Sequence, residues 1–416
     1  MILNKYSFGN GDRFAHEGKA QLKASIIARN EGVTITPVWN KSFREHQTVK
    51  STPEDVRIET NEAVESLGWK GQYLIDADHI NLSNVDAFID SSDFFTLDVA
   101  DYIGKPASEG EINLFVGKYS NYVGEWKVPG IKEPFTISKK FLEQIALDFL
   151  FAINEAKQIY NYIADKKGVD GFITEVSMDE VMNPQTPVEL FFILAAISDT
   201  GIPAQTIAPK FTGQFNKGVD YVGDINKFSK EFEEDILIIK LAIKEFGLPE
   251  NLKLSVHSGS DKFSIYDPIN SIIKKHDAGL HIKTAGTTWL EELISLAEVG
   301  GNGLKIAKNI YSQALNRYDE LTGPYSTVID IEYNNLPTMK TVNDWDGKKF
   351  ANTLRHDQGN PSYDPEFRQL LHCAYKIAAE LGEEFTNALN QYSNEIEKNV
   401  TQNLYESHIK PIFIGK

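Results

Sequence analysis

The chain has 416 residues, a formal net charge of −17 and 41% hydrophobic residues, which is enough apolar material for a large packed core. The acidic balance argues against a nucleic-acid partner, because phosphate binding requires concentrated Lys and Arg. No uncharged apolar run is long enough to span a bilayer, and the N-terminus lacks the apolar core of a signal peptide. We therefore expect a cytoplasmic protein with no membrane partner. A single cysteine, Cys373, excludes an intrachain disulfide and is expected to be buried.

Short apolar runs alternate with longer helical patterns along the chain. This alternation is typical of α/β proteins with a parallel sheet, and eight runs predict a closed (β/α)8 TIM-type barrel in which residues 1–416 form one catalytic domain. The expected strands are 33–38, 72–77, 94–98, 171–176, 204–208, the runs that begin at Leu254 and Leu280, and 326–331.

Two segments depart from the alternation. The segment 101–135 contains many Gly and Pro residues and is predicted to be an inserted loop or small β subdomain over one end of the barrel. The segment 364–400 predicts a helical C-terminal layer. Capping boxes at 186–189 and 288–291 predict the starts of two barrel helices.

The most informative residues close two neighbouring apolar runs. The first run leads to His257 and Lys262, and the second leads to His281 and Lys283. Polar residues at the carboxyl ends of barrel strands share one face, so both histidines are expected in one pocket. Imidazole is a common metal ligand, and the lysines suit an anionic substrate. Two hydrogen-bonded core histidines are the alternative interpretation.

Further candidates stand at other strand ends. Asp78 and His79 follow the run 72–77, and Glu175 lies inside an apolar run, where a carboxylate needs a metal, a lysine or a proton. Three histidines with a nearby carboxylate match a divalent-metal site that has open positions, and a second carboxylate could act as acid or base. Asp78 could instead cap a turn, and Asp220 could either reach the pocket from a loop or cap a helix.

The remaining histidines and the absent motifs narrow the chemistry. His16, His46, His276 and His408 lie in polar surroundings and are expected at the surface, while the role of His356 is open. The sequence contains no phosphate-binding loop, dinucleotide fingerprint or nucleophile elbow, so we expect no nucleotide cofactor. A metal-assisted lyase, isomerase or epimerase that acts on a small polar molecule remains.

Several long motifs resemble those of the tagaturonate/fructuronate epimerase family. They span 174–180, 186–192, 208–211, 217–224, 255–262, 281–287 and 370–376. The resemblance implies an enzyme of hexuronate catabolism that interconverts two keto-uronates, small anionic sugar acids that differ at one hydroxyl-bearing carbon. The Asp78–His79 pair is also similar to the pair used by class II aldolases, in which the Asp handles a proton and the His binds metal.

The resemblance also implies roles for the candidate residues. A divalent cation (Zn, Mn, Co or Ni) would be bound by His79, His257 and His281, and Asp78 and Glu175 would share the acid–base work, with Glu175 as an alternative ligand. Lys262, Lys283 and Asp220 would contact the substrate. Because the inverted carbon lies β to the ketone, enolisation does not acidify its hydrogen, which favours a retro-aldol/aldol route.

Other functions stay open at this point. A related metal-dependent aldolase, an epimerase for another keto-sugar and a non-catalytic uronate-binding protein are the alternatives. The sequence also leaves a homo-oligomeric state open.

Overall fold

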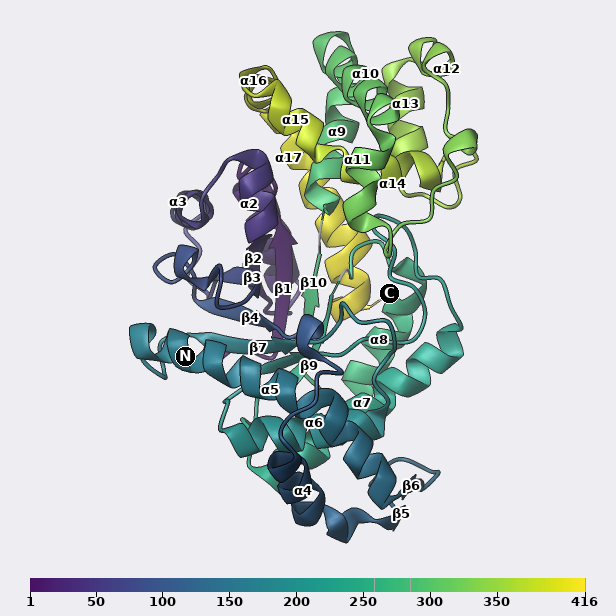
Figure 1. Ribbon diagram of the computed structural model, residues 1–416. Helices are drawn as coiled ribbons and strands as arrows, with labels where there is room; N and C mark the ends of the chain where they lie inside the picture. The colour runs from purple at the N-terminus through teal and green to yellow at the C-terminus, as the bar shows by residue number, and fades with distance from the viewer. Residues whose placement is uncertain (258, 285, 416) are drawn as a thin grey trace.

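A computed structural model describes residues 1–257, 259–284 and 286–415. Ser258 and Ala285, which belong to two of the motifs above, lie outside the described residues, as does Lys416. Within the described part, eight parallel strands close into a barrel in the order β1-β10-β9-β8-β7-β4-β3-β2 (Figure 1). The strands are β1 (Tyr6–Gly11), β2 (Thr36–Ser42), β3 (Leu74–Ile80), β4 (Phe94–Asp98), β7 (Ile173–Ser177), β8 (Thr206–Ala208), β9 (Lys253–Val256) and β10 (Leu280–Lys283). The predicted (β/α)8 barrel is confirmed.

The eighth strand differs from the prediction. Residues 326–331 contain no strand, and β1 closes the barrel between β10 and β2 instead. The β1 sequence, Tyr6–Gly11, contains two glycines that weaken its strand pattern. Close packing explains the first, since a Cβ on Gly9 would lie 3.1 Å from Lys283 Cα and 3.2 Å from Ile282 O. The segment 326–331 has a strand-like composition, but a closed barrel has no free edge for it to join.

Helices connect the strands around the barrel. They are α1 (Gly18–Asn30), α2 (Phe43–Val49), α3 (Pro53–Ser66), α5 (Lys139–Lys167), α6 (Pro187–Thr200), α7 (Ile225–Phe246) and α8 (Phe263–Lys275), and α9 (Thr287–Glu298) follows the last strand. Thr186 and Glu189 form the predicted capping box of α6. The second predicted box is wrong, because the N-cap of α9 is Gly286, two residues before Thr288, and Glu291 is buried.

The segment 101–135 and residues 301–391 lie at opposite ends of the molecule in Figure 1. The first contains α4 (Glu109–Lys118) and β5 (Gly124–Trp126), which pairs with β6 (Phe135–Ile137). Beyond α9, a group of helices that we call the helical cap stands above the barrel in the figure. It comprises α10 (Gly301–Asn316), α11 (Tyr318–Thr322), η4 (Gly323–Tyr325), α12 (Met339–Asn343), α13 (Gly347–Leu354), α14 (Pro365–Cys373), α15 (Tyr375–Leu381) and α16 (Glu383–Gln391).

The chain then returns along the barrel wall through α17 (Ser393–Gln402) and η6 (Asn403–Ile414), which pack against α1 and α8. Among the described residues, no helix combines the length and the apolar character that a membrane span needs.

A buried cluster around Asp261, which we call the Asp261 junction, joins the cap to the barrel. Asp261 follows β9, and its Oδ2 accepts a hydrogen bond of 2.6 Å from Arg368 Nη2 of α14. Its backbone N–H donates to His408 Nε2 of η6 at 3.1 Å, and His356 Nδ1 lies 3.7 Å from its Oδ2. The surface positions predicted for His408 and His46 are therefore wrong, since both side chains are buried. A local polar sequence does not show that a distant carboxylate will cover a side chain.

We expect Arg368→Met to lower the free energy of unfolding by about 3–5 kcal/mol, because the substitution leaves Asp261 as a buried charge with its main partner removed. Urea unfolding measures the change. Arg317→Met is the matched control, because it removes the more exposed ion pairs to Glu320 and Glu380 and should cost about 1 kcal/mol or less. Equal losses in the two variants would contradict a structural role for the junction.

Candidate active site

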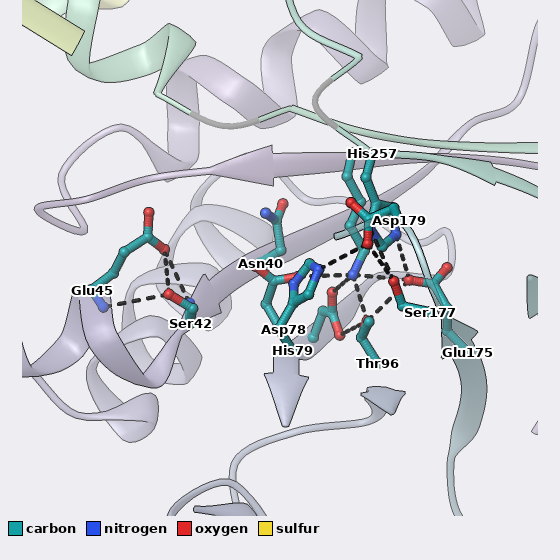
Figure 2. A network of polar contacts seen from close by, with 12 residues as sticks. Asn40, Ser42, Glu45, Asp78, His79, Thr96, Glu175, Ser177, Asp179 and His257 are labelled. Atoms are coloured by element: carbon teal, nitrogen blue, oxygen red, sulfur yellow. Dashed lines mark hydrogen bonds and ion pairs between the residues drawn. The ribbon is translucent and has the colours of Figure 1, made fainter. Parts of the chain in front are cut away.

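Polar side chains converge at the carboxyl ends of β3, β7 and β9 (Figure 2). The rings of His79 and His257 lie 5.1 Å apart between centroids. Asp179 Oδ1 is 3.4 Å from His79 Nε2 and 3.1 Å from His257 Nδ1. One ligand atom from each of these three residues lies within 4.8 Å of the others, so they could hold one metal ion together. We call this group the His/Asp triad.

A second carboxylate holds each imidazole of the triad. Asp78 Oδ1 lies 2.9 Å from His79 Nδ1, and Glu175 Oε1 lies 2.8 Å from His257 Nε2. These contacts use one ring nitrogen of each histidine and direct the other toward Asp179. Carboxylate–histidine pairs of this kind orient the ligands in many metal sites.

The backbone at His79 is strained. Its φ is 53°, in the left-handed region that residues with a side chain rarely adopt, and the pairing of β3 with β4 shifts register between Ala77 and Ile80. Bulges in strands re-aim side chains, and such strain persists where surrounding contacts enforce it. The irregularity therefore belongs to the local structure that presents His79 to the triad.

Lys283 lies beside the triad among three carboxylates. Its Nζ is 2.7 Å from Asp76 Oδ2, 2.9 Å from Asp78 Oδ1 and 3.0 Å from Glu175 Oε1. Burial opposes the ammonium charge, but the three carboxylates outweigh it and hold the pKa of Lys283 well above its usual range. Lys283 is therefore a permanent positive charge at the carboxyl end of the barrel.

The pKa values of the three carboxylates around Lys283 shift in different directions. Burial opposes ionisation of Asp78 and Glu175, but Lys283 and the neighbouring histidines outweigh it and hold both pKa values below the usual range. For Asp76 burial dominates and raises the pKa to about 7. Thr96 Oγ1 also donates to Asp76 Oδ1 at 2.9 Å. Asp76 is thus the carboxyl group that can exchange a proton near neutral pH.

His281 lies one layer deeper in the barrel than the triad. It pairs in register with Ser255, and Ile282 pairs with Val256, so Lys283 rather than His281 comes level with His257. His281 Nδ1 is 2.9 Å from Ser7 Oγ, and its ring packs 5.2 Å from that of Phe94. Burial lowers the pKa of His281 to about 3, so the ring is neutral.

Lys262 and Asp220 lie apart from the triad, near the start of α8. Lys262 Nζ donates to three backbone carbonyl oxygens, at 2.9 Å to Asn216, 2.7 Å to Val219 and 2.9 Å to Ser260. Asp220 Oδ1 accepts from the N–H and Oγ of Ser264, at 3.1 and 2.9 Å. The structure brings together five of the eight predicted residues, namely Asp78, His79, Glu175, His257 and Lys283, and leaves His281, Lys262 and Asp220 outside the group.

The sequence interpretation missed Asp179 and Asp76, although each carried a signal. Asp179 lies two residues beyond the end of β7, where barrel enzymes place functional groups. Asp76 lies two residues before Asp78 on β3, and the period of two along a strand places both side chains on one face. Both residues are found if every polar residue near the end of a strand is considered, and not one residue per strand.

A cavity of about 290 Å³ opens at this site. Its walls come from α2, the strand ends, the loop before α7 and the helical cap, which contributes Tyr325. The volume is at the lower end of the range for small-molecule sites. The described residues that line it include Asp78, His79, Asp179, His257 and Lys283, together with Arg13, Asn40, Arg44 and Lys217.

The triad fits a divalent cation by the chemistry of its donors. Two imidazole nitrogens and one carboxylate oxygen are ligands for catalytic metal ions, and three protein ligands leave positions open for substrate. The surrounding charge also favours a cation, because Asp179 and Glu175 overcome burial and raise the pKa of His257 to about 9. A bound metal ion would replace the positive charge that protonated histidines otherwise supply.

Comparisons with known proteins identify the family of this chain. The model of the UxaE family, described as tagaturonate epimerase, matches residues 1–412. The chain belongs to the tagaturonate epimerase family. It is 27% identical over 389 residues to the tagaturonate/fructuronate epimerase of Thermotoga maritima, which covers 89% of this chain and 72% of the relative. The family and the isomerase class predicted from the sequence motifs are therefore confirmed.

Solved structures show the same fold. A glycerol complex of the fructuronate-tagaturonate epimerase UxaE from Cohnella laeviribosi superposes with a TM-score of 0.80, and the native structure with 0.79. Each is 23% identical in sequence and covers 99% of this chain and 82% of its own. The likeness extends through the barrel and the helical cap.

We expect Asp179→Asn to weaken Mn²⁺ binding by at least about 100-fold, because the substitution removes the only anionic donor of the His/Asp triad. Calorimetric titration of the metal-stripped protein measures the affinity. Asp101→Asn, at an exposed carboxylate outside the triad, is the control and should bind as the parent does. Parent-like affinity in Asp179→Asn would remove this residue from the ligand set.

Proposed function

We propose that this protein interconverts tagaturonate and fructuronate with the help of a divalent cation bound by His79, Asp179 and His257. The observation that carries the proposal is the convergence of these three donors within 4.8 Å beside a cavity of about 290 Å³. The family membership supplies the substrate class, because the relatives are named for these two sugar acids.

The substrate limits the reaction. The carbon that is inverted lies β to the ketone, so its configuration changes most simply if a carbon–carbon bond breaks and forms again on the other face. The hydroxyl proton on that carbon must leave as the bond breaks and must return as it forms. A cation at the triad would polarise the oxygens of the substrate.

The residues of the chain have separate parts in this scheme. Asp78 lines the cavity and is the carboxylate placed to accept the hydroxyl proton. Lys283 contacts both Asp78 and Asp76, so it can give one of its protons to Asp76, the group with a pKa of about 7, as it takes a proton from Asp78, and it stays protonated throughout. Lys283 also adds positive charge beside the cavity, while its N–H groups are taken by the three carboxylates. Glu175 is fully buried and positions His257.

The decisive experiment follows the reaction by NMR in D₂O. Metal-stripped protein is supplied with Mn²⁺ or Zn²⁺ and fructuronate, and we expect metal-dependent formation of tagaturonate with no deuterium at the inverted carbon. Deuterium at that carbon would indicate direct proton exchange instead. Free carbonyl fragments would indicate an aldolase, and the absence of conversion with any metal would indicate a binding protein.

We expect Asp76→Asn to lower kcat by about 100-fold or more while Mn²⁺ affinity stays within about threefold of the parent, because general acid–base transfer contributes that much and Asp76 contacts no member of the triad. Asp78→Asn is the matched comparison and should lower both quantities, since Asp78 also holds His79. Steady-state kinetics at saturating metal, together with calorimetry, separate the two effects. An unchanged kcat in Asp76→Asn would rule out the transfer to Asp76.

A further inference from the structure

The substrate carboxylate needs a binding site of its own. If the proposed function holds, the keto and hydroxyl oxygens of the sugar acid lie at the triad, and the carboxylate several carbons away must reach another wall of the cavity. A carboxylate in a protein site is matched by a cationic side chain with free N–H donors. The cavity must therefore contain a basic residue whose N–H donors are free.

Three basic residues near the site already have their charge and donors engaged. Lys262 donates to three carbonyl oxygens and is not among the described residues that line the cavity. Lys283 is surrounded by three carboxylates. Arg13 lines the cavity, but it is ion-paired with Glu45 and lies 3.9 Å from the ring centroid of Tyr375. A substrate carboxylate would have to compete with these buried contacts.

Arg44 differs from these residues. It stands in the first turn of α2, is exposed and lines the cavity. Its guanidinium lies 5.0 Å from the ring centroid of Tyr325 in the helical cap, and within the described residues no carboxylate pairs with its side chain. Contact with an aromatic face holds a guanidinium in place while its edge stays free to donate. Lys217 lines the same cavity and adds positive charge.

The local sequence explains why Arg44 keeps its donors. Its neighbour Glu45 forms the capping box of α2, in which Glu45 Oε2 accepts the Ser42 N–H at 3.0 Å, and it also pairs with Arg13. The nearest carboxylate in the sequence is therefore occupied twice. Figure 2 shows Ser42 and Glu45 on one side of Asp78 and His79, with Asn40 between them. Arg44 belongs to α2 and lines the cavity from that helix, whereas the triad stands at the ends of β3, β7 and β9.

We propose that Arg44, held against Tyr325, binds the carboxylate of the substrate and makes the enzyme selective for sugar acids over neutral keto-sugars. A planar guanidinium can bind a carboxylate through two parallel hydrogen bonds, which a neutral hydroxymethyl group cannot match. This inference rests on the proposed function for its substrate, but it assigns a residue that lies outside the catalytic group.

The test compares Arg44→Ala with the parent on two substrates. One is fructuronate, and the other is fructose, which carries a hydroxymethyl group in place of the carboxylate. We expect kcat/KM for fructuronate to fall by about 30-fold or more, through KM more than kcat, while binding and turnover of fructose stay within about threefold. Arg44→Lys should recover part of the loss, because it keeps the charge and loses the fork.

Arg29→Ala is the matched control. Arg29 is also exposed, and its guanidinium lies 5.3 Å from the ring centroid of Trp69. Arg29 is not among the described residues that line the cavity. The control should leave both substrates unaffected. An equal loss on fructuronate and fructose in Arg44→Ala would show a structural role and overturn the proposal, as would an unchanged KM for fructuronate.

Failure of the proposed function would be seen in the parent protein, and binding would then test the role of Arg44. If the parent does not convert fructuronate, calorimetry still measures its binding to the parent and to Arg44→Ala. Weaker binding of fructuronate alone in the variant would support Arg44 as the carboxylate site even then. Equal binding in the two proteins would overturn it.

Discussion

The site depends on one buried ammonium group. Lys283 Nζ lies within 3.0 Å of carboxylate oxygens from Asp76, Asp78 and Glu175, which come from two different strands. Carboxylates so close together would repel one another in the barrel, and burial alone would favour their neutral forms. Lys283 keeps Asp78 and Glu175 ionised. Those two carboxylates then orient His79 and His257, so the geometry of the His/Asp triad derives from a lysine that is not itself a member.

The Asp261 junction serves the same site from outside the barrel. Asp261 lies in the same loop after β9 as His257, which directly follows the strand. Asp261 binds Arg368 of α14 and His408 of η6. The junction therefore couples the loop next to the triad to the helical cap, which contributes Tyr325 to the cavity. In the proposals above, the chemistry is assigned to residues at the strand ends and substrate recognition to a residue of α2 beside the cap. With that division, selectivity would change without change at the triad.

Much of the site could be read from residue types at strand ends. Parallel strands in a closed barrel bring the polar residues within and after their apolar runs to one face. This rule found His257, Glu175, Asp78, His79 and Lys283. The missed residues show the limit of that rule. Asp179 lies two residues past the end of its strand, and Asp76 lies one layer below Asp78, so neither is the residue that closes its apolar run. The fold was likewise predictable as a class, but β1 was missed because its sequence includes glycine at position 9, where the chain packs closely against Ile282 and Lys283.

The sequence by itself determined the alternation of strands and helices, the local caps such as Thr186 and Glu189, and the family motifs, because these depend on residues near one another in the chain. The tertiary structure alone decided the register between strands. The pairing of His281 with Ser255 places Lys283, and not His281, level with His257. It also decided that His408 is buried against Asp261, 147 residues away in the chain. Such placements depend on contacts between distant segments, which a local pattern of residues does not specify.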